Sequence, residues 1–196
     1  DEPFTTGDNR ILQMQLGYWC DTLGWPTCSV FYEDRLFMAG APGAPELLGG
    51  SRTGAYEDFS QRTALNEVLD DSALVFFLTS RKRGPVRWMA SDERALLVGT
   101  GTGEWIIKSP TEGTAITARS ISAKQTTKFG SAPNVAPIEV GQQVLYVSRS
   151  RRSLRELTYV FQADGYKSPD MTVFASHMMA AKLAEMDFQQ EPHSLV

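Results

Sequence analysis

Short apolar segments alternate with polar or glycine-rich turns along most of the chain, which predicts a fold built mainly from β-strands. The clearest stretch covers residues 86–108. It reads as a strand, a polar turn at 91–93, an apolar strand at 95–98, a glycine turn at 99–103 and a strand at 104–107. β-Branched and aromatic residues are frequent in the strand positions, as expected for a pleated, half-buried surface.

The same plan recurs at residues 29–51 and 137–161, where paired strands again flank a short polar turn. In each copy a glutamate begins or enters the next strand: Glu46, Glu104 and Glu156. A repeat of this size is close to the roughly 40–50 residues of a four-stranded propeller blade. The sequence therefore favours a mainly β fold, an incomplete β-propeller-like array of antiparallel blades over residues 24–174. An ordinary β-sandwich with similar hairpins is the alternative.

Segments outside these repeats have patterns of their own. Residues 1–23 read as an irregular lead-in. A continuous apolar run at 74–78 predicts a buried strand, and alternation over 115–125 predicts a half-exposed one. Residues 189–196 read as the start of a further strand.

The pattern over residues 175–188 predicts the one helix of the chain. We expect this helix at the end of a single β-rich domain that covers residues 1–196. Four side chains would form its apolar side: Met178, Met179, Leu183 and Met186. Alanines with high helix propensity fill the positions between them. Ser176 is the predicted N-terminal cap.

Composition changes this picture little. A chain of 196 residues suffices for one domain with a real core, and 42% hydrophobic with 21% charged residues is ordinary for a globular protein. A net charge of -4 gives no whole-protein argument for binding nucleic acid. No apolar run reaches the roughly 18 residues of a membrane-spanning helix. Two thiols in a domain of this size, Cys20 and Cys28, favour an unbridged pair over a disulfide.

No stretch carries a specific catalytic, cofactor-binding or metal-binding motif. The glycine turn at 99–103 lacks the spacing and the Lys-Ser/Thr ending of a phosphate-binding loop, so a hairpin is the better interpretation. His177 and His193 have no partner at metal-ligand spacing. Adjacent carboxylates occur in two predicted turns: Asp70-Asp71 and Asp92-Glu93. We therefore expect no enzymatic activity, no cofactor and no metal. A propeller-type carbohydrate-binding or carbohydrate-degrading protein is the alternative.

Two turns are rich in cations, and they supply the candidate contact residues: Arg81, Lys82, Arg83, Arg149, Arg151, Arg152 and Arg155. Such clusters contact nucleic-acid phosphates. They also form solvated hairpin tips or salt bridges between subunits, and this second interpretation is favoured on general grounds. No aromatic residues interleave with the cations in a way that supports base stacking.

Five segments carry a resemblance to known proteins: GWPTCSVFYEDRLFMAG, SRTGAYEDFS, VRWMASDERALLVGTGTGEWII, TTKFGSAPNVAPIEVGQQVLYVSRSRRSLRELTYVFQADGYKSPDMTVFASHM and DFQQEPHSLV. The most specific parts are RELTYVFQADGYKSPDMT and FQQEPHSLV. From about Gly24 onward, nearly the whole chain resembles a family of short-tailed bacteriophage virion proteins. These are tail-nozzle or tail-tube proteins, akin to the packaged-DNA stabilisation (tail accessory) proteins.

The resemblance implies a β-propeller-bearing subunit of a ring, commonly a hexamer, at the end of the tail channel. Such a ring retains packaged DNA, which passes through it during ejection. The expected partners are further copies of the chain, neighbouring tail or adaptor proteins and, transiently, phage DNA. The protein would be made in the bacterial host cytoplasm and act in the virion. The family offers no catalytic residues to carry over. Because EPHSLV begins another strand in related sequences, the resemblance also implies a fragment of a longer propeller-bearing protein.

Overall fold

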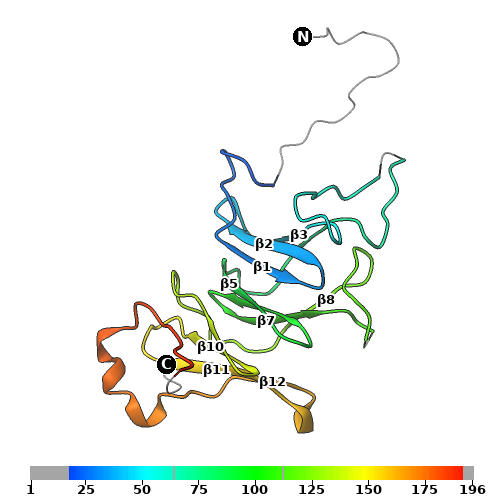
Figure 1. Ribbon diagram of the computed structural model, residues 1–196. Coiled ribbons are helices and arrows are strands. Elements are labelled where there is room, and N and C mark those ends of the chain that lie inside the picture. Colours follow the sequence, from blue (N-terminus) through cyan, green and yellow to red (C-terminus); the bar gives the residue numbers. More distant parts are fainter. Residues whose placement is uncertain (1–17, 64, 112, 192–196) are drawn as a thin grey trace.

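The computed structural model describes residues 18–63, 65–111 and 113–191, and within these ranges twelve strands form three four-stranded antiparallel sheets (Figure 1). The first sheet contains β1 (Cys28–Tyr32), β2 (Arg35–Ala41), β3 (Ala44–Gly50) and β4 (Leu74–Phe77). The second contains β5 (Val86–Ser91), β6 (Leu96–Thr100), β7 (Gly103–Lys108) and β8 (Ser122–Gln125). The third contains β9 (Ile138–Val140), β10 (Gln143–Val147), β11 (Leu154–Val160) and β12 (Gly165–Lys167).

Each sheet is a meander in which every strand pairs with its neighbour in the chain. The prediction of a mainly β fold is therefore confirmed. The glycine turn is a hairpin turn, because β6 and β7 pair in register on either side of Gly101 and Thr102. The strand predicted over 115–125 is shorter than expected. Only Ser122–Gln125 forms β8, while Thr117 and Ser120 close a turn before it.

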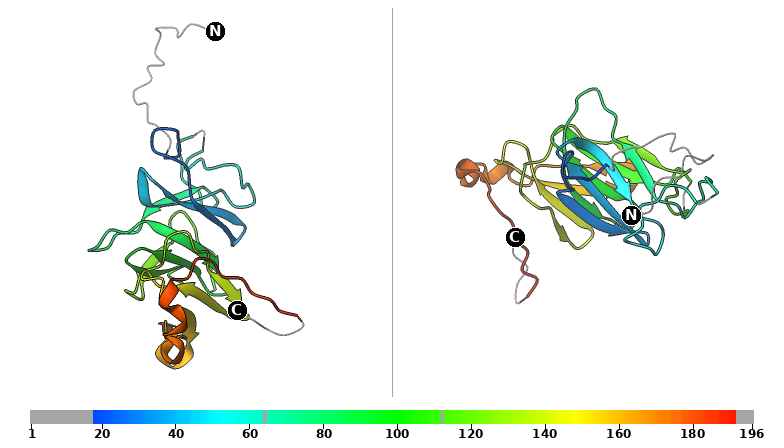
Figure 2. Two further views of the ribbon diagram at one scale, coloured as in Figure 1. Left: turned by 90° about the vertical axis from the view of Figure 1, so that its left-hand side faces the viewer. Right: turned by 90° about the horizontal axis from the view of Figure 1, so that it is seen from above.

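The three sheets stack face to face, with the second in the middle (Figures 1 and 2). Alternate residues of a strand point to opposite faces, so β6 contributes to two cores. Leu96 and Val98 face the first sheet, where they pack with Phe37 and Leu48. On the other face, Leu97 packs with a group that includes residues of the third sheet: Val144, Tyr146 and Leu157. Every side chain in these two cores is at most 9% exposed.

Glycine is required at one point inside the second sheet. Gly99 of β6 lies opposite Trp88 of β5, whose indole ring covers the glycine. A Cβ atom at position 99 would lie 2.1 Å from Trp88 Cε2, so the ring or the backbone would have to shift. The absence of a side chain therefore lets the indole approach the backbone of β6 closely.

Two of the three repeated glutamates, Glu46 and Glu104, hold the linker that leads to the next sheet. Glu104 and Ile106 lie on the same face of β7, and Ile106 packs towards the third sheet. Its carboxylate accepts hydrogen bonds from the hydroxyls of Thr127 and, at 3.1 Å, Ser131. In the first sheet, Glu46 Oε1 accepts the Gly84 amide of the next linker at 2.9 Å.

The third glutamate differs from the other two. Glu156 is 8% exposed, and no hydrogen bond joins its carboxylate to any residue that the structure describes. At the backbone it repeats the earlier pattern, since its amide donates to Pro169 O as the Glu104 amide donates to Thr127 O. Proline supplies no hydroxyl at this position, so the side-chain contact of the second sheet has no counterpart.

A buried arginine fixes the long connection between β3 and β4. Arg35 is 2% exposed, and its guanidinium donates to three backbone carbonyls: Ser51 O at 2.7 Å, Ser72 O at 2.8 Å and Asp70 O at 2.8 Å. Burial lowers the pKa of Arg35 from its usual value. Both ends of the connection are thereby tied to the first turn of the first sheet.

The helix predicted over residues 175–188 is wrong. Two short 3-10 turns, η2 (Val173–Ala175) and η3 (Met178–Ala181), replace its beginning, and the described residues after them form no helix. Ser176 makes no side-chain cap. Lys182 has a φ of 62°, which is incompatible with a helix, and the Leu183 amide donates to Arg151 O at 2.8 Å.

Packing explains this correction. A short helix in water needs its apolar side buried. Leu183 and Met186 instead pack against a small buried cluster of Ala132, Val135 and Val147, and Met178 remains 71% exposed. One further 3-10 turn, η1 (Phe161–Ala163), joins β11 to β12.

Both cysteines are free thiols. Trp19, within the predicted lead-in, lies over Gly49 on the outer face of the first sheet and meets Phe59 at 4.9 Å between ring centroids. Residues 1–17 of the predicted lead-in lie outside the described residues, as do residues 192–196 of the predicted final strand.

A candidate nucleic-acid interface

The meander topology sorts the turns between two ends of the stack. In an antiparallel meander, successive turns lie at opposite ends of the sheet. The β6–β7 and β10–β11 turns therefore fall at the end where the linkers between sheets begin. The acidic turns at 33–34 and 92–93 fall at the other end.

Backbone contacts join these turns and linkers into one edge. Thr102 Oγ1 donates to Lys82 O at 3.2 Å, and Gly101 N to Pro85 O at 3.0 Å, which ties the first linker to the β6–β7 turn. Across the second linker, Ser131 N donates to Thr100 O at 2.9 Å and Arg149 N to Gly130 O at 2.9 Å. Segments 80–87, 100–103, 127–131 and 148–153 are thus continuous. We call them the basic edge.

The basic edge carries cations and no carboxylates. Its four segments contain eight Lys or Arg residues and not one Asp or Glu: Arg81, Lys82, Arg83, Arg87, Lys128, Arg149, Arg151 and Arg152. Seven of these are exposed, and Arg151 is half-buried because its guanidinium donates to Pro133 O at 2.7 Å. Among the described residues, one ion pair involves these cations: Glu46 lies 3.9 Å from the Nε of Arg83, whose side chain is 92% exposed. An exposed pair of this kind leaves the cation available.

Six of the seven cations singled out in the sequence lie on this edge, and Arg155 does not share their exposure. Its side chain is 15% exposed, with NH2 3.8 Å from Asp170 and NH1 donating to Ser168 O at 2.9 Å. Arg87 and Lys128 join the edge although sequence reasoning missed them. Lys128 is the single cation of its segment, and three uncharged residues separate Arg87 from the cluster at 81–83. The Nε of Arg87 lies 4.0 Å from the position of a Cβ atom on Gly101, which places this side chain beside the β6–β7 turn.

The edge suits a polyanion. Exposed cations in a row without intervening carboxylates bind phosphates through a sequence-independent, salt-sensitive attraction. The other partner that suits such a row of cations is a protein surface rich in carboxylates. The contrast with the chain's net charge of -4 shows that its negative charges are gathered elsewhere.

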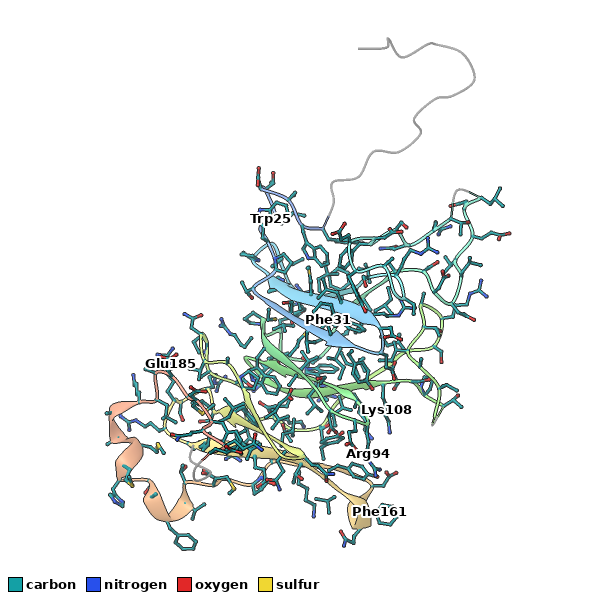
Figure 3. All side chains as sticks on the ribbon, in the orientation of Figure 1. Trp25, Phe31, Arg94, Lys108, Phe161 and Glu185 are labelled. Carbon is teal, nitrogen blue, oxygen red and sulfur yellow. The ribbon has the colours of Figure 1, made fainter. Side chains whose placement is uncertain are left out.

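Part of that negative charge surrounds a cleft of about 660 Å³ at the opposite end, where loops of all three sheets meet. Tyr32 and Glu33 come from the first sheet, Tyr159 and Tyr166 from the third. The second sheet contributes Glu93, Arg94 and Lys108 among others. Figure 3 shows Arg94 and Lys108 on the same side of the molecule, away from Trp25 and Glu185.

Several polar groups of the cleft are held by hydrogen bonds or ring contacts. Tyr166 donates to the Asp92 carboxylate, and burial followed by this contact raises the pKa of Tyr166. Tyr159 donates to Asp164 Oδ1 at 2.7 Å, and the Arg94 guanidinium lies 4.6 Å above the Tyr159 ring. Glu33 Oε2 accepts the Ile116 amide at 2.6 Å. The cleft therefore presents aromatic walls with a rim of fixed polar groups.

Among residues 18–63, 65–111 and 113–191, no group of three or more His, Cys, Asp or Glu side chains has the arrangement of a metal site. The same residues include no helix long and apolar enough to cross a membrane.

Neither a scan against protein-family models nor a search among curated proteins finds a match for this chain.

Proposed function

We propose that this chain is a structural component of a short bacteriophage tail, in the nozzle or tail-tube ring, and that its basic edge contacts the DNA that the ring retains and releases. The observation that carries the proposal is the basic edge, whose four segments contain eight cations and no Asp or Glu. A channel wall must attract the phosphate backbone without reading its sequence, and exposed Lys and Arg side chains do this.

The fold supports the proposal in a second way. Each sheet is a four-stranded meander, and the three stack face to face, as consecutive blades of a propeller do. We take them as three blades of an incomplete β-propeller-like array. Their common orientation gathers the linkers at one end, so a ring of copies would present its basic edges to one channel.

Fluorescence anisotropy with a labelled duplex of roughly 30 base pairs tests the proposal. The variant Arg149→Gln with Arg152→Gln removes two exposed cations for which no side-chain partner exists among the described residues. The matched control, Arg62→Gln with Lys108→Gln, removes two exposed cations away from the basic edge.

The wild type and the control are expected to bind with a steep salt dependence. In the basic-edge variant, the slope of log K against log salt should become shallower by about 2, because each lost phosphate contact removes about 0.9. Absent binding, or equal slopes for the variant and the wild type, would contradict a DNA-contacting role for this edge.

The cleft favours a second candidate function, saccharide binding. Tyrosine rings provide flat apolar surfaces, and the fixed carboxylates, Arg94 and Lys108 provide hydrogen-bond partners for hydroxyl groups. An array of bacterial surface polysaccharides tests this candidate, with Tyr159→Ala as the variant that should lose any signal. An array without hits would remove it.

A further inference from the structure

Phe129 is an exposed aromatic residue in the middle of the basic edge. It follows Lys128 in the linker between the second and third sheets, and it is 47% exposed. It belongs to none of the hydrophobic cores. A phenylalanine at such a position does little for core packing, so its role must be sought at the surface.

One face of this ring is covered and held. The Arg155 guanidinium lies over it, with Cζ 3.5 Å from the ring centroid. Arg155 is itself fixed by Ser168 O and Asp170. The guanidinium is therefore a rigid support, and the cation–π contact holds the ring in one orientation. Since the residue is 47% exposed and Arg155 covers one face, we infer that the other face of the ring is open to solvent.

The linker backbone around Phe129 is fixed as well. Thr127 O accepts the Glu104 amide at 3.3 Å on one side, and Gly130 O accepts the Arg149 amide at 2.9 Å on the other. Gly130 has a φ of 76° and packs against Gly101, where a Cβ atom would lie 2.5 Å from the carbonyl oxygen. Phe129 is thus presented from a rigid segment between the cations Lys128 and Arg149.

We propose that Phe129 is a stacking platform for an unpaired nucleobase, so that the basic edge binds single-stranded nucleic acid in addition to duplex. The open face of the ring stacks the base, and Lys128 and Arg149 neutralise the flanking phosphates. Arg155 is a positioning residue that acts through the ring. A flat aromatic surface beside cations accepts any base, because every base has a π-face. Bases inside a duplex are already stacked and do not reach the platform.

This inference rests on the proposed contact between the basic edge and DNA, and the experiment separates the two. Anisotropy is measured with a labelled oligothymidylate of about 15 nucleotides and with a duplex of the same length. Phe129→Leu keeps an apolar side chain and removes the π-surface, whereas Phe129→Trp enlarges that surface. Phe161→Leu is the matched control, since Phe161 is 79% exposed and lies in the β11–β12 connection, outside the basic edge.

Phe129→Leu is expected to weaken oligothymidylate binding about 10-fold while duplex affinity and the salt slope stay unchanged. Phe129→Trp should retain or tighten oligothymidylate binding, and Phe161→Leu should change neither. Unchanged oligothymidylate binding in Phe129→Leu, or equal losses for both nucleic acids, would overturn the platform and leave the duplex contact standing. Failure of the wild type to bind either nucleic acid would overturn the platform together with the proposed function. An unchanged thermal midpoint in each variant shows that binding is compared between folded proteins.

Discussion

Replacing Arg35 with methionine tests whether a single buried cation holds the long connection between β3 and β4. The guanidinium is 2% exposed and donates to Ser51 O, Ser72 O and Asp70 O at 2.7–2.8 Å. Methionine fills much of the same volume but supplies no donor. Three carbonyl groups that now accept from a charged donor would each have to find water or remain unsatisfied.

The magnitude follows from opposing terms. Hydrogen bonds to a charged group contribute about 1.5–3 kcal/mol each, so three give roughly 5–9 kcal/mol. Burying the guanidinium costs several kcal/mol, which the variant no longer incurs. The expected net loss of unfolding free energy is about 3–5 kcal/mol, in the range observed when one partner of a buried charged network is removed.

Urea denaturation followed by circular dichroism measures this loss. Arg35→Lys should fall between the wild type and Arg35→Met, because an ammonium keeps the charge without the planar fork that reaches three carbonyls. The control is Arg87→Met on the exposed side of β5, where a change within about 0.5 kcal/mol is expected. A loss below about 1 kcal/mol in Arg35→Met would refute the anchoring role.

Three further changes probe the stack itself. Burial raises the pKa of the Glu104 carboxyl, so the folded state binds this proton more tightly than the unfolded state does. The free energy of unfolding should therefore fall as pH rises from 4.5 through the raised pKa. Urea titrations of Glu104→Gln should lack this part of the pH dependence. Gly99→Ala should destabilise the protein by about 1–3 kcal/mol or more, because its Cβ would collide with the Trp88 ring, whereas Gly101→Ala, with its nearest neighbour 3.6 Å away, should be nearly neutral in the same denaturation assay. Burial raises the pKa of Cys28 to about 11, so iodoacetamide should label this thiol at least about 100-fold more slowly in the native state than in urea; rapid native labelling at neutral pH would contradict its burial.

The strands were predictable because hairpins are local. In the second sheet, β-branched and aromatic runs stand on either side of short turns, and the turn residues fix the pairing register. The faces that these strands bury depend on the neighbouring sheets. Glu104 accepts hydrogen bonds from the hydroxyls of Thr127 and Ser131, which lie 23 and 27 residues later in the chain. The sequence gives no sign of these contacts apart from the recurrence of a glutamate.

The false helix shows where periodicity misleads. Met178, Met179, Leu183 and Met186 have helical spacing, but that spacing stabilises a helix only where a complementary apolar surface meets all four. The small cluster of Ala132, Val135 and Val147 takes up Leu183 and Met186, but neither Met178 nor Met179. The hydrogen bond from the Leu183 amide to Arg151 O then favours an extended path of the chain after residue 182.

The candidate site was visible in the sequence only in pieces. Two cationic turns stood out because their charges are consecutive or nearly so, but their joining into one edge depends on how the sheets stack. Arg155 looked like part of the second turn, and its position in β11 instead turns it inward towards Phe129 and Asp170. The role of Arg35 has no sequence signal, because no pattern distinguishes an arginine that donates to buried carbonyls from one that faces water.

Photo-crosslinking to DNA tests the central claim most directly, because it reports which face of the protein touches the nucleic acid. Benzoylphenylalanine would replace Lys82 or Arg152 on the basic edge, and Glu93 or Lys108 at the cleft end. Crosslinks to labelled duplex are expected from positions 82 and 152, and they should disappear at about 1 M salt as the phosphate attraction is screened. Crosslinks from positions 93 and 108 alone, or crosslinks that persist in high salt, would contradict the assignment of the basic edge as the DNA-contacting surface.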